Sequence, residues 1–569
     1  MSEFIIKNGH VFDAVTGQKG DVADVCIKDG KFVDKVSSSA TVIDATGKTV
    51  MAGALDVHTH VAGPKVNLGR WYRPEDKFRL GERCSARIDP KTKIEGGFSI
   101  PTVFKTGYEY ARMGFGFLME AAMPPLYSRH VHEEIRDTPI VDEAAMPVFG
   151  NNWFMFEYLK NGEIDNAAAY VAWMLRQTKG YGIKCVNPGG SEAWAWGLNC
   201  MTVNDPVPYF EITPKEIIAG LITTNEELHL PHSVHLHSNN LGNPGNYTTT
   251  LDSLKIAEDF KPNNNLGRKT VLHHTHIQFH SYGGTGWGDF ESKSKEVMDY
   301  VNKTPQISID TGSVTLDETT TMTADGPFEY HLGALNHLKW GNVDVELETS
   351  SGVVPYVYSP NVKVCDIQWA IGLEVPLFAK DPMRTMITTD HPNAGPFTRY
   401  PRIYAWLMDK DYRDKLLNSF KYATKVIDAT YLAEIDREIS LYELSQMTRA
   451  GPAQVLGLSG SMGGLAPGMK ANLAVYNINP DNMPKGIDLE NALARSAYFF
   501  KDGVKVVENG VVLEADPVTK KTYWVDAKVP ENKQVMHDIS EKFLKYYSVN
   551  LGNYEVIDHY APNQEIIEV

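Results

Sequence analysis

The chain has 569 residues, with 55 Lys and Arg against 71 Asp and Glu, and a formal charge of −16 at pH 7. Its composition, 43% hydrophobic and 22% charged, is that of an ordinary globular protein. The acidic balance, which no Lys- or Arg-rich run offsets, argues against a protein that binds nucleic-acid phosphates. This length suggests three or four domains at about 150 residues each, although barrels exceed that size.

Cysteine usage and hydropathy indicate the compartment. The five cysteines are scattered and contain no C-x-x-C motif: Cys26, Cys84, Cys185, Cys200 and Cys365. This argues against a disulfide framework and an iron–sulfur carrier, and it fits a reducing cytoplasm. The first residues lack the basic region and apolar core of a secretory signal. No uncharged apolar run approaches the roughly 18 residues of a transmembrane helix. We therefore expect a cytoplasmic protein without a membrane span.

The two ends of the chain have the same pattern. Residues 4–13, 23–36 and 40–50 predict short strands separated by turns, and residues 465–480, 496–513 and 521–525 repeat the pattern. Neither group has enough strands to be stable alone, so we expect the two to pair into one small β-sandwich. Residues 1–53 and 451–528 would form this sandwich, and residues 529–569 would be an extension on the surface.

Residues 54–450 between these ends have a different pattern. Strand-like apolar runs alternate with longer helical stretches, which is the signature of parallel β/α units. The eight runs lie at residues 50–60, 116–125, 146–152, 180–188, 231–240, 270–279, 305–312 and 384–395. They predict an α/β fold, a (β/α)8 TIM-like barrel carrying the terminal β-sandwich. An open doubly wound sheet is the alternative, but no G-x-G-x-x-G follows the first run.

Histidines cluster at the ends of several runs. His58 and His60 form an H-x-H motif at the end of the first run, and strand alternation points both imidazoles the same way. Imidazole suits zinc and similar ions, although such a pair taken alone is more often structural. His237 and His276 in the fifth and sixth runs and Asp390 in the eighth add further ligand types. Together they favour a metal site at the barrel mouth.

Lys184, in the fourth run, is unusual because burying an unpaired ammonium costs several kcal/mol. Two interpretations remain open from the residue alone. It could be a solvated lysine at a strand end, or a neutral amine that has taken up CO2 to form a carbamate bridging two metal ions.

The order of these residues along the runs resembles the amidohydrolase superfamily, in which the same positions hold a binuclear metal centre on a (β/α)8 barrel. The resemblance implies a ligand set of His58, His60, Lys184, His237, His276 and Asp390. His237 is preferred to His235 because HSNN follows it, and His276 is preferred to His273 and His274 because it ends its run. Two divalent ions, expected to be zinc, would be bridged by N6-carboxylated Lys184, and Asp390 would move the proton.

Longer motifs narrow the resemblance. GRWYRPEDKFR, FGNNWFMFEYLK, LPHSVHLHSNNLGNPGNYTTTL and TTDHPNAGPFTRYPR look like the A subunits of formylmethanofuran dehydrogenase, and the likeness covers nearly the whole chain. It implies a polypeptide that interconverts formate plus methanofuran with N-formylmethanofuran in CO2 fixation and methanogenesis. Partner subunits would reduce CO2 to formate: iron–sulfur subunits, together with one that contains tungsten or molybdenum and is like formate dehydrogenase. This chain itself is expected to hold no iron–sulfur cluster, molybdopterin or tungstopterin.

Three alternatives remain open. The A subunit of the bacterial formyltransferase/hydrolase complex shares many of these motifs, and a stand-alone N-acyl or cyclic amide hydrolase would use the same metal ligands. A structural subunit that has lost its chemistry is disfavoured because all six family positions are filled.

Residues that contact the substrate are harder to identify. The family resemblance implies that methanofuran carries an acidic glutamyl tail, so basic side chains near the mouth are expected contacts. The candidates are Lys65, Arg70, Arg73 and Arg399. The more common role of such residues is that of a solvated or salt-bridged surface residue. Asp310, in the IDTGS segment at the end of the seventh run, is expected to line the site.

Overall fold

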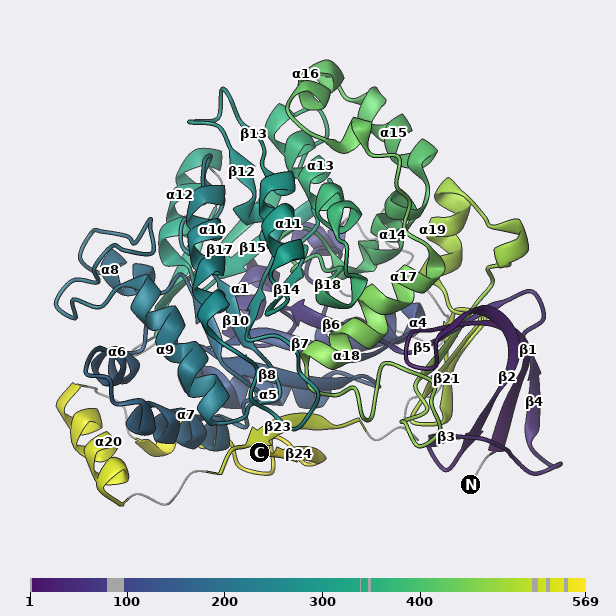
Figure 1. The fold of residues 1–569 in the computed structure, drawn as a ribbon, viewed down its shortest axis with the longest axis horizontal. Helices are drawn as coiled ribbons and strands as arrows, with labels where there is room; N and C mark the ends of the chain where they lie inside the picture. Colours follow the sequence, from purple (N-terminus) through teal and green to yellow (C-terminus); the bar gives the residue numbers. More distant parts are fainter. Residues whose placement is uncertain are drawn as a thin grey trace.

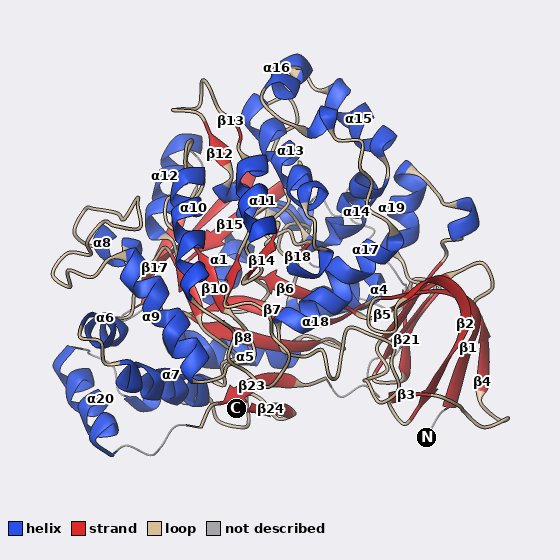
Figure 2. Cartoon of the chain, viewed as in Figure 1, coloured by secondary structure: helices blue, strands red, loops and turns tan. Residues whose placement is uncertain are grey.

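Helices surround one group of strands and leave a second group uncovered at one end of the molecule in the computed structural model of the chain (Figure 1, Figure 2). The structure describes residues 3–78, 97–337, 339–345, 349–513, 520–528, 533–546 and 551–569. Cys84 and parts of the predicted C-terminal extension lie outside these ranges. The mixed α/β class predicted from the sequence is confirmed.

Parallel strands form the centre of the molecule. Within the described ranges these are β6 (Ala54–Thr59), β7 (Phe115–Met123), β8 (Asp142–Pro147), β9 (Lys184–Val186), β10 (Val234–His237), β11 (Leu272–His274), β14 (Ile307–Asp310) and β18 (Thr385–Met386). They pair in the order β6-β7-β8 and β9-β10-β11-β14-β18. Two isolated parallel bridges join these sheets, Val148 with Lys184 and Thr59 with His391. The strand order therefore returns to its starting point.

A helix precedes each strand of this ring after β6. These helices are α4 (Val103–Met113), α5 (Ser128–Asp137), α7 (Ile164–Thr178), α9 (Pro214–Glu227), α10 (Tyr247–Lys255), α11 (Ser294–Lys303) and α13 (Lys363–Phe378). Local signals set their ends: α9 begins at Pro214 because Thr213 and Glu216 form a capping box there. Helical crossovers keep successive strands parallel, so the carboxyl ends of all the strands meet at one end of the ring.

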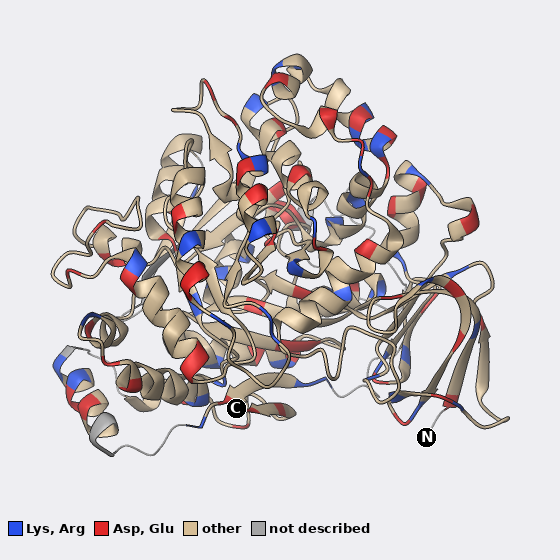
Figure 3. Cartoon of the chain, viewed as in Figure 1, with Lys and Arg blue, Asp and Glu red and all other residues tan. Residues whose placement is uncertain are grey.

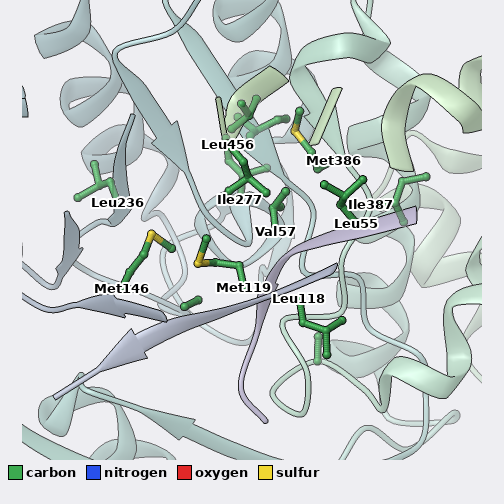
Figure 4. Close-up of a cluster of buried hydrophobic side chains, with 14 of the residues drawn as sticks. Leu55, Val57, Leu118, Met119, Met146, Leu236, Ile277, Met386, Ile387 and Leu456 are labelled. Atoms are coloured by element: carbon green, nitrogen blue, oxygen red, sulfur yellow. The ribbon is translucent and has the colours of Figure 1, made fainter. Parts of the chain in front are cut away.

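Neighbouring strands of the ring share an apolar core. Leu55 and Val57 of β6, Leu118 of β7 and Leu236 of β10 belong to one buried cluster, which also includes Leu456 (Figure 4). By contrast, histidine side chains approach one another in the interior of the ring of strands. The ring centroid of His235 lies 4.9 Å from that of His58 and 4.8 Å from that of His273. A polar interior in an otherwise apolar core indicates where function is located.

The two chain ends contribute to a separate sheet, seen at the right of Figure 1. Its described strands are β1 (Glu3–Asp13), β2 (Gln18–Lys28), β3 (Lys31–Val33), β4 (Thr41–Asp44), β5 (Thr49–Ala52), β19 (Leu473–Tyr476), β20 (Tyr498–Lys501), β21 (Val504–Glu508) and β22 (Val511–Val512). The antiparallel pair β5–β19 joins the two halves. A bridge from Lys31 to Lys470 brings the edge strand β3 back beside the segment before β19, so the sheet curls around a core of its own.

One predicted strand of this sheet lies elsewhere. Residues 521–525, expected in the terminal sandwich, form β23 (Thr522–Asp526), which pairs in parallel with β8. The C-terminal strand β24 (Gln564–Glu568) pairs with β23 in turn. The prediction for residues 521–525 is therefore wrong. The physical reason is that β9 is bridged only to Val148, the residue that follows β8, so the amino-terminal half of β8 would otherwise be an open edge.

A smaller antiparallel sheet lies between β14 and α13 in the sequence. It consists of β15 (Glu318–Thr323), β16 (Gly341–Val345) and β17 (Thr349–Val357), and the helices α1 (Pro64–Tyr72) and α12 (Gly326–Asn336) pack against it. We call this sheet and its two helices the cap. Among the described helices, none is long and apolar enough to cross a membrane.

Candidate metal centre

All the predicted metal ligands line one pocket at the carboxyl ends of the parallel strands. The lining includes His58, His60, Lys184, His237, His276 and Asp390, and each of these residues is buried. His58 and His60 lie on one side of their strand, because the intervening Thr59 contacts the hydroxyl of Tyr110 in the opposite direction, at 3.1 Å. The structure thus brings together residues that are up to 332 positions apart in the sequence.

One group of potential ligand atoms lies close to the carboxylate of Asp390. Its Oδ1 lies 3.0 Å from Nε2 of His58 and 3.2 Å from Nε2 of His60. This oxygen nevertheless makes no hydrogen bond to any described residue, whereas Oδ2 accepts one from the Asn393 side chain at 2.9 Å. Close ligand atoms that do not hydrogen-bond one another are arranged as they would be around an ion. His58, His60 and Asp390 could therefore hold a metal.

A second group lies beside the first. The rings of His237 and His276 are 4.7 Å apart, and the ring of His276 is 5.3 Å from that of His58. The backbone of His276 has a φ of 32°, and its N–H donates to Asp310 Oδ1 at 2.9 Å. The Nδ1 atom of His276 has no hydrogen-bond partner among the described residues. This ring is therefore fixed through its backbone while one of its nitrogens remains available.

Lys184 completes the set. It begins β9 in register with His235, and its side chain is 2% exposed. Its Nζ has no hydrogen-bond partner within the described part of the chain, and burial lowers the pKa of this amine to about 8. Such burial excludes the alternative of a solvated lysine at a strand end. A buried, unpartnered amine among imidazoles and a carboxylate fits a position that a metal-bound group completes.

Carboxylates behind the ligands orient their rings, and sequence reasoning missed two of them. Glu120 lies 3.0 Å from Nδ1 of His60, and Asp325 lies 3.1 Å from Nε2 of His237. A carboxylate only accepts, so each of these ring nitrogens carries the hydrogen and the other nitrogen keeps its lone pair. A signal for Glu120 was present in the sequence, since it is the lone acid in the apolar run GFLMEAAMPP.

Asp310 also orients the imidazole of a predicted ligand. It was predicted to line the site, but the structure places it behind the ligands. It is not among the pocket-lining residues, and its carboxylate accepts from Nδ1 of His58 at 3.1 Å, from His273 at 3.2 Å and from Thr388 Oγ1 at 2.7 Å. Burial opposes its ionisation, yet the charge of His58 and the hydrogen bond from His273 hold the pKa of Asp310 well below its ordinary value. Asp310 is thus occupied by positioning His58.

The predicted arginine contacts are also occupied by the protein. Arg70 pairs with Glu134 at 3.0 Å, and Arg399 pairs with both oxygens of Asp317 at 2.9 and 3.1 Å. Arg73 lies 3.3 Å from Asp76 and 3.4 Å from Glu318. None of the three lines the pocket. The expected basic patch is therefore not at the pocket, because carboxylates of the fold neutralise these charges.

Lys65 is the basic candidate closest to the pocket. Its side chain is 3% exposed, and its Nζ donates to the carbonyl of Ala122, a pocket-lining residue, at 3.3 Å. Burial lowers the pKa of Lys65, while the charges of Glu120 and Asp390 act in the opposite sense. The ammonium thus lies just behind the wall and does not form part of it.

A second pocket adjoins the first through Leu241 and Phe328, which line both. Its wall includes Asn199, Asn240 and Trp287 but no Lys or Arg among the described residues. Charges of both signs are instead interspersed over the outer helices (Figure 3). The space next to the candidate metal centre is therefore amide-rich and apolar.

A family model described as "Amidohydrolase family" matches residues 41–512. The chain belongs to the amidohydrolase family. This membership confirms the prediction of a metal-dependent amidohydrolase, since the family typically binds a binuclear metal centre and the histidine and aspartate groups here could hold a metal ion.

Individual relatives of this amidohydrolase agree. It is 52% identical to "Protein FwdA" of Methanocaldococcus jannaschii over 572 aligned residues, covering 100% of this chain and 99% of the relative. It is 34% identical to the A subunit of the "Formyltransferase/hydrolase complex Fhc" of Methylorubrum extorquens, covering 89% of each chain. These relatives confirm the resemblance to formylmethanofuran dehydrogenase A subunits that the sequence motifs indicated.

A solved structure supports the same fold over the whole length. The crystal structure of the formyltransferase/hydrolase complex FhcABCD from Methylorubrum extorquens, in complex with methylofuran, contains a chain with a TM-score of 0.88 to this one. The two are 31% identical, and the match covers 100% of this chain and 99% of that chain. That relative is thus a member of a multi-subunit assembly.

Proposed function

We propose that this chain is the A subunit of a formylmethanofuran dehydrogenase, and that it interconverts N-formylmethanofuran and water with formate and methanofuran. In hydrolysis, a C–O bond forms from water to the formyl carbon, the C–N bond breaks, and the amine nitrogen gains a proton. The observation that carries the proposal is the gathering of the six predicted ligands in one buried pocket. They occur in a chain 52% identical to FwdA over its full length.

The residues present fit two divalent ions, for which zinc suits the donor set. His58, His60 and Asp390 would hold one ion, and His237 and His276 the other, with Lys184 as a carbamate between them. The unpartnered Nζ of Lys184 and Nδ1 of His276 support this division. When bound, such ions supply Lewis acidity toward a carbonyl and lower the pKa of water toward about 7.

Asp390 is suited to move the proton. Its carboxylate is fixed by the hydrogen bond that Asn393 donates to Oδ2, and it would accept a proton from the attacking water and return it to the departing amine. Glu120 and Asp310 would keep the imidazoles of His60 and His58 aimed at the same point.

The cap would keep water out of the pocket. Thr321 and Thr323 of β15 line the pocket, and every residue of that strand is buried. Condensation of formate with an amine releases water, so a shielded site favours the synthetic direction. The substrate beyond the formyl group would extend into the adjoining amide-rich pocket past Leu241 and Phe328.

The remaining predictions extend this proposal. Partner subunits carrying tungsten or molybdenum and iron–sulfur clusters would reduce CO2 to formate in the cytoplasm. We further infer that the parallel ring is the (β/α)8 barrel of the family and that the curled terminal sheet is its β-sandwich. The corresponding polypeptide of a bacterial formyltransferase/hydrolase complex is the second candidate, favoured by the TM-score of 0.88 to a chain of FhcABCD.

Metal analysis combined with an N-formyl-amine hydrolysis assay tests the proposal on the full chain. We expect about two zinc ions per chain and formate release that falls about 100- to 10,000-fold in Asp390→Asn, because the proton carrier is lost. Asp381→Asn, which changes an aspartate outside the pocket, is the matched control. Fewer than about one metal per chain, or full activity in Asp390→Asn, would contradict the mechanism. Comparing methanofuran with methylofuran as the formyl carrier separates the two candidate functions.

A further inference from the structure

Two hydroxyl groups on the pocket wall lack a protein partner. Thr321 lines the pocket, and its Oγ1 is buried without a hydrogen bond to any described residue. Tyr358 lines the same pocket at 6% exposure, and within the described part of the chain its hydroxyl makes no hydrogen bond. The neighbouring Tyr356, by comparison, places its hydroxyl 3.9 Å from Sγ of Cys365.

The other polar groups on the wall are committed. Asn393 donates to Asp390 at 2.9 Å and accepts from the backbone N–H of Met322 at 2.6 Å. The hydroxyl of Thr323 accepts from the backbone N–H of Asp325 at 3.2 Å. The rest of the described wall consists of the six predicted ligands and the apolar residues Ala122, Val186, Leu241, Phe279 and Phe328. Among the described residues of the wall, Thr321 and Tyr358 are therefore the ones whose hydroxyls neither donate nor accept a hydrogen bond within the protein.

The Thr321 hydroxyl is buried without a partner, which costs about 1–3 kcal/mol, so folded proteins seldom leave such a group unless a ligand completes it. Both hydroxyls are also fixed in place. Thr321 lies in the β15–β17 ladder opposite Val354, and the backbone N–H of Tyr358 donates to the carbonyl of Asp317 at 3.1 Å. The Tyr358 ring packs edge-on against Tyr356 with centroids 4.8 Å apart. Rigid, unpartnered groups of this kind are suited to bind a polar ligand.

We propose that Tyr358 donates a hydrogen bond to the acyl oxygen of the substrate and that Thr321 accepts one from the amide N–H. The inference rests on the proposed function and assigns two substrate contacts within that site. A formamide presents one acceptor and one donor, and two hydroxyls complement this pair. Burial holds the pKa of Tyr358 well above its ordinary value, so the phenol keeps its proton and can donate.

The two contacts have different energetic consequences. As water adds to the formyl carbon, negative charge develops on the acyl oxygen, and a fixed donor stabilises that charge more than it stabilises the bound substrate. The contact to the N–H is made equally in the ground state, so it contributes to binding. Loss of the Tyr358 hydroxyl should thus lower kcat, and loss of the Thr321 hydroxyl should raise KM.

Kinetics of formate release from an N-formyl amine by the zinc-loaded full chain test this split. Tyr358→Phe is expected to lower kcat about 100-fold with KM changed less than about threefold, the loss seen for a single oxyanion donor. Thr321→Val is expected to raise KM about fivefold, the effect of roughly one neutral hydrogen bond, and Thr321→Ser should restore it. Zinc content should stay at the parent level in all three variants, and Tyr356→Phe is the matched control.

The outcomes separate this inference from the proposed function. If the parent releases formate while Tyr358→Phe keeps its kcat within about twofold, the inference is wrong and the hydrolase stands. If the zinc-loaded parent releases no formate, both are wrong. Should Tyr358→Phe lose zinc, the Thr321→Val and Thr321→Ser pair decides by itself, because equal KM values in those two variants would overturn the contact.

Discussion

Two buried lysines, at opposite ends of the parallel strands, have opposite surroundings. Lys501 ends β20 of the terminal sheet, and its Nζ lies 3.0 Å from Asp142 Oδ2 at the start of β8, with both side chains 0% exposed. Lys184, at the carboxyl end, has no such partner. Although burial opposes it, Asp142 raises the pKa of Lys501, whereas burial lowers the pKa of Lys184 to about 8.

The difference shows which buried charges are structural. A paired lysine joins the terminal sheet to the ring and is satisfied by the fold itself. An unpaired buried lysine costs stability, and at Lys184, which lines the pocket, a group supplied from outside could offset that cost. Burial alone therefore does not identify a functional residue; Lys184 is distinguished because it lacks a partner and also lines the pocket with the other predicted ligands.

The largest effect is expected when Lys184, the unpaired lysine of this comparison, is replaced. Lys184→Ala should lose its metal ions and lower formate release by at least about 1,000-fold, because metal assistance supplies several kcal/mol. The metal-free variant should unfold at no lower urea concentration than the metal-free parent. Added short carboxylic acids should restore part of the metal content by replacing the bridge. Retention of both metals without such an acid would show that the carbamate is not needed.

Replacing Lys501, the paired lysine, should lower the stability of the fold and leave the metal site unchanged. Lys501→Met leaves Asp142 buried without its partner and is expected to lower the free energy of unfolding by about 3–5 kcal/mol. Urea denaturation measures this loss, and the zinc content of the folded protein should not change. Adding Asp142→Asn should recover part of the stability. A single variant as stable as the parent would mean that the pair does not join the two regions.

Residues behind the ligands should give intermediate effects. Glu120→Gln and Asp310→Asn are each expected to weaken zinc binding by about 10- to 100-fold. In each variant the imidazole that the carboxylate orients, that of His60 or His58, would lose its fixed orientation. Competition with a chromophoric chelator measures the affinity. Glu134→Gln, which changes a carboxylate paired with Arg70 away from the pocket, is the control. Unchanged zinc affinity in Asp310→Asn would mean that Asp310 does not orient His58 for metal binding.

The smallest effect is expected for Arg399, a partly exposed basic residue whose charge is already paired with Asp317. Arg399→Met should change KM for the formylated substrate by less than about threefold and lower the free energy of unfolding by about 1 kcal/mol at most. Steady-state kinetics and urea denaturation check both values. A tenfold rise in KM would instead place the acidic part of the substrate at Arg399.

The ligand set was predictable because each member ends a recognisable run. His58 and His60 are separated by one residue on a strand, and Lys184 is an isolated cation in an apolar run. Asp310 was placed at the correct end of its strand, but sequence does not tell whether a side chain faces the pocket or the ring behind it. The three arginines failed for a related reason, since their partners Glu134, Asp317 and Glu318 are distant in the sequence.

Strand membership was also only partly predictable. Residues 521–525 have the alternation of a strand, which says nothing about which sheet they join. Their position beside β8 depends on the short reach of β9, a property of the ring as a whole. Thr321 and Tyr358 carried no signal, because a hydroxyl becomes informative only when its lack of a partner is known.

The pairing of β5 with β19 has a consequence for how the protein is made. These strands are separated by more than 400 residues, and β5 leads directly into β6, the strand that carries His58. During synthesis β5 can pair with β1 but must remain without its second partner, β19, until nearly the whole chain has left the ribosome. Any fragment that ends before residue 473 would therefore expose the edge of β5, and a nascent chain of this length would need protection from aggregation until about its last sixth emerges.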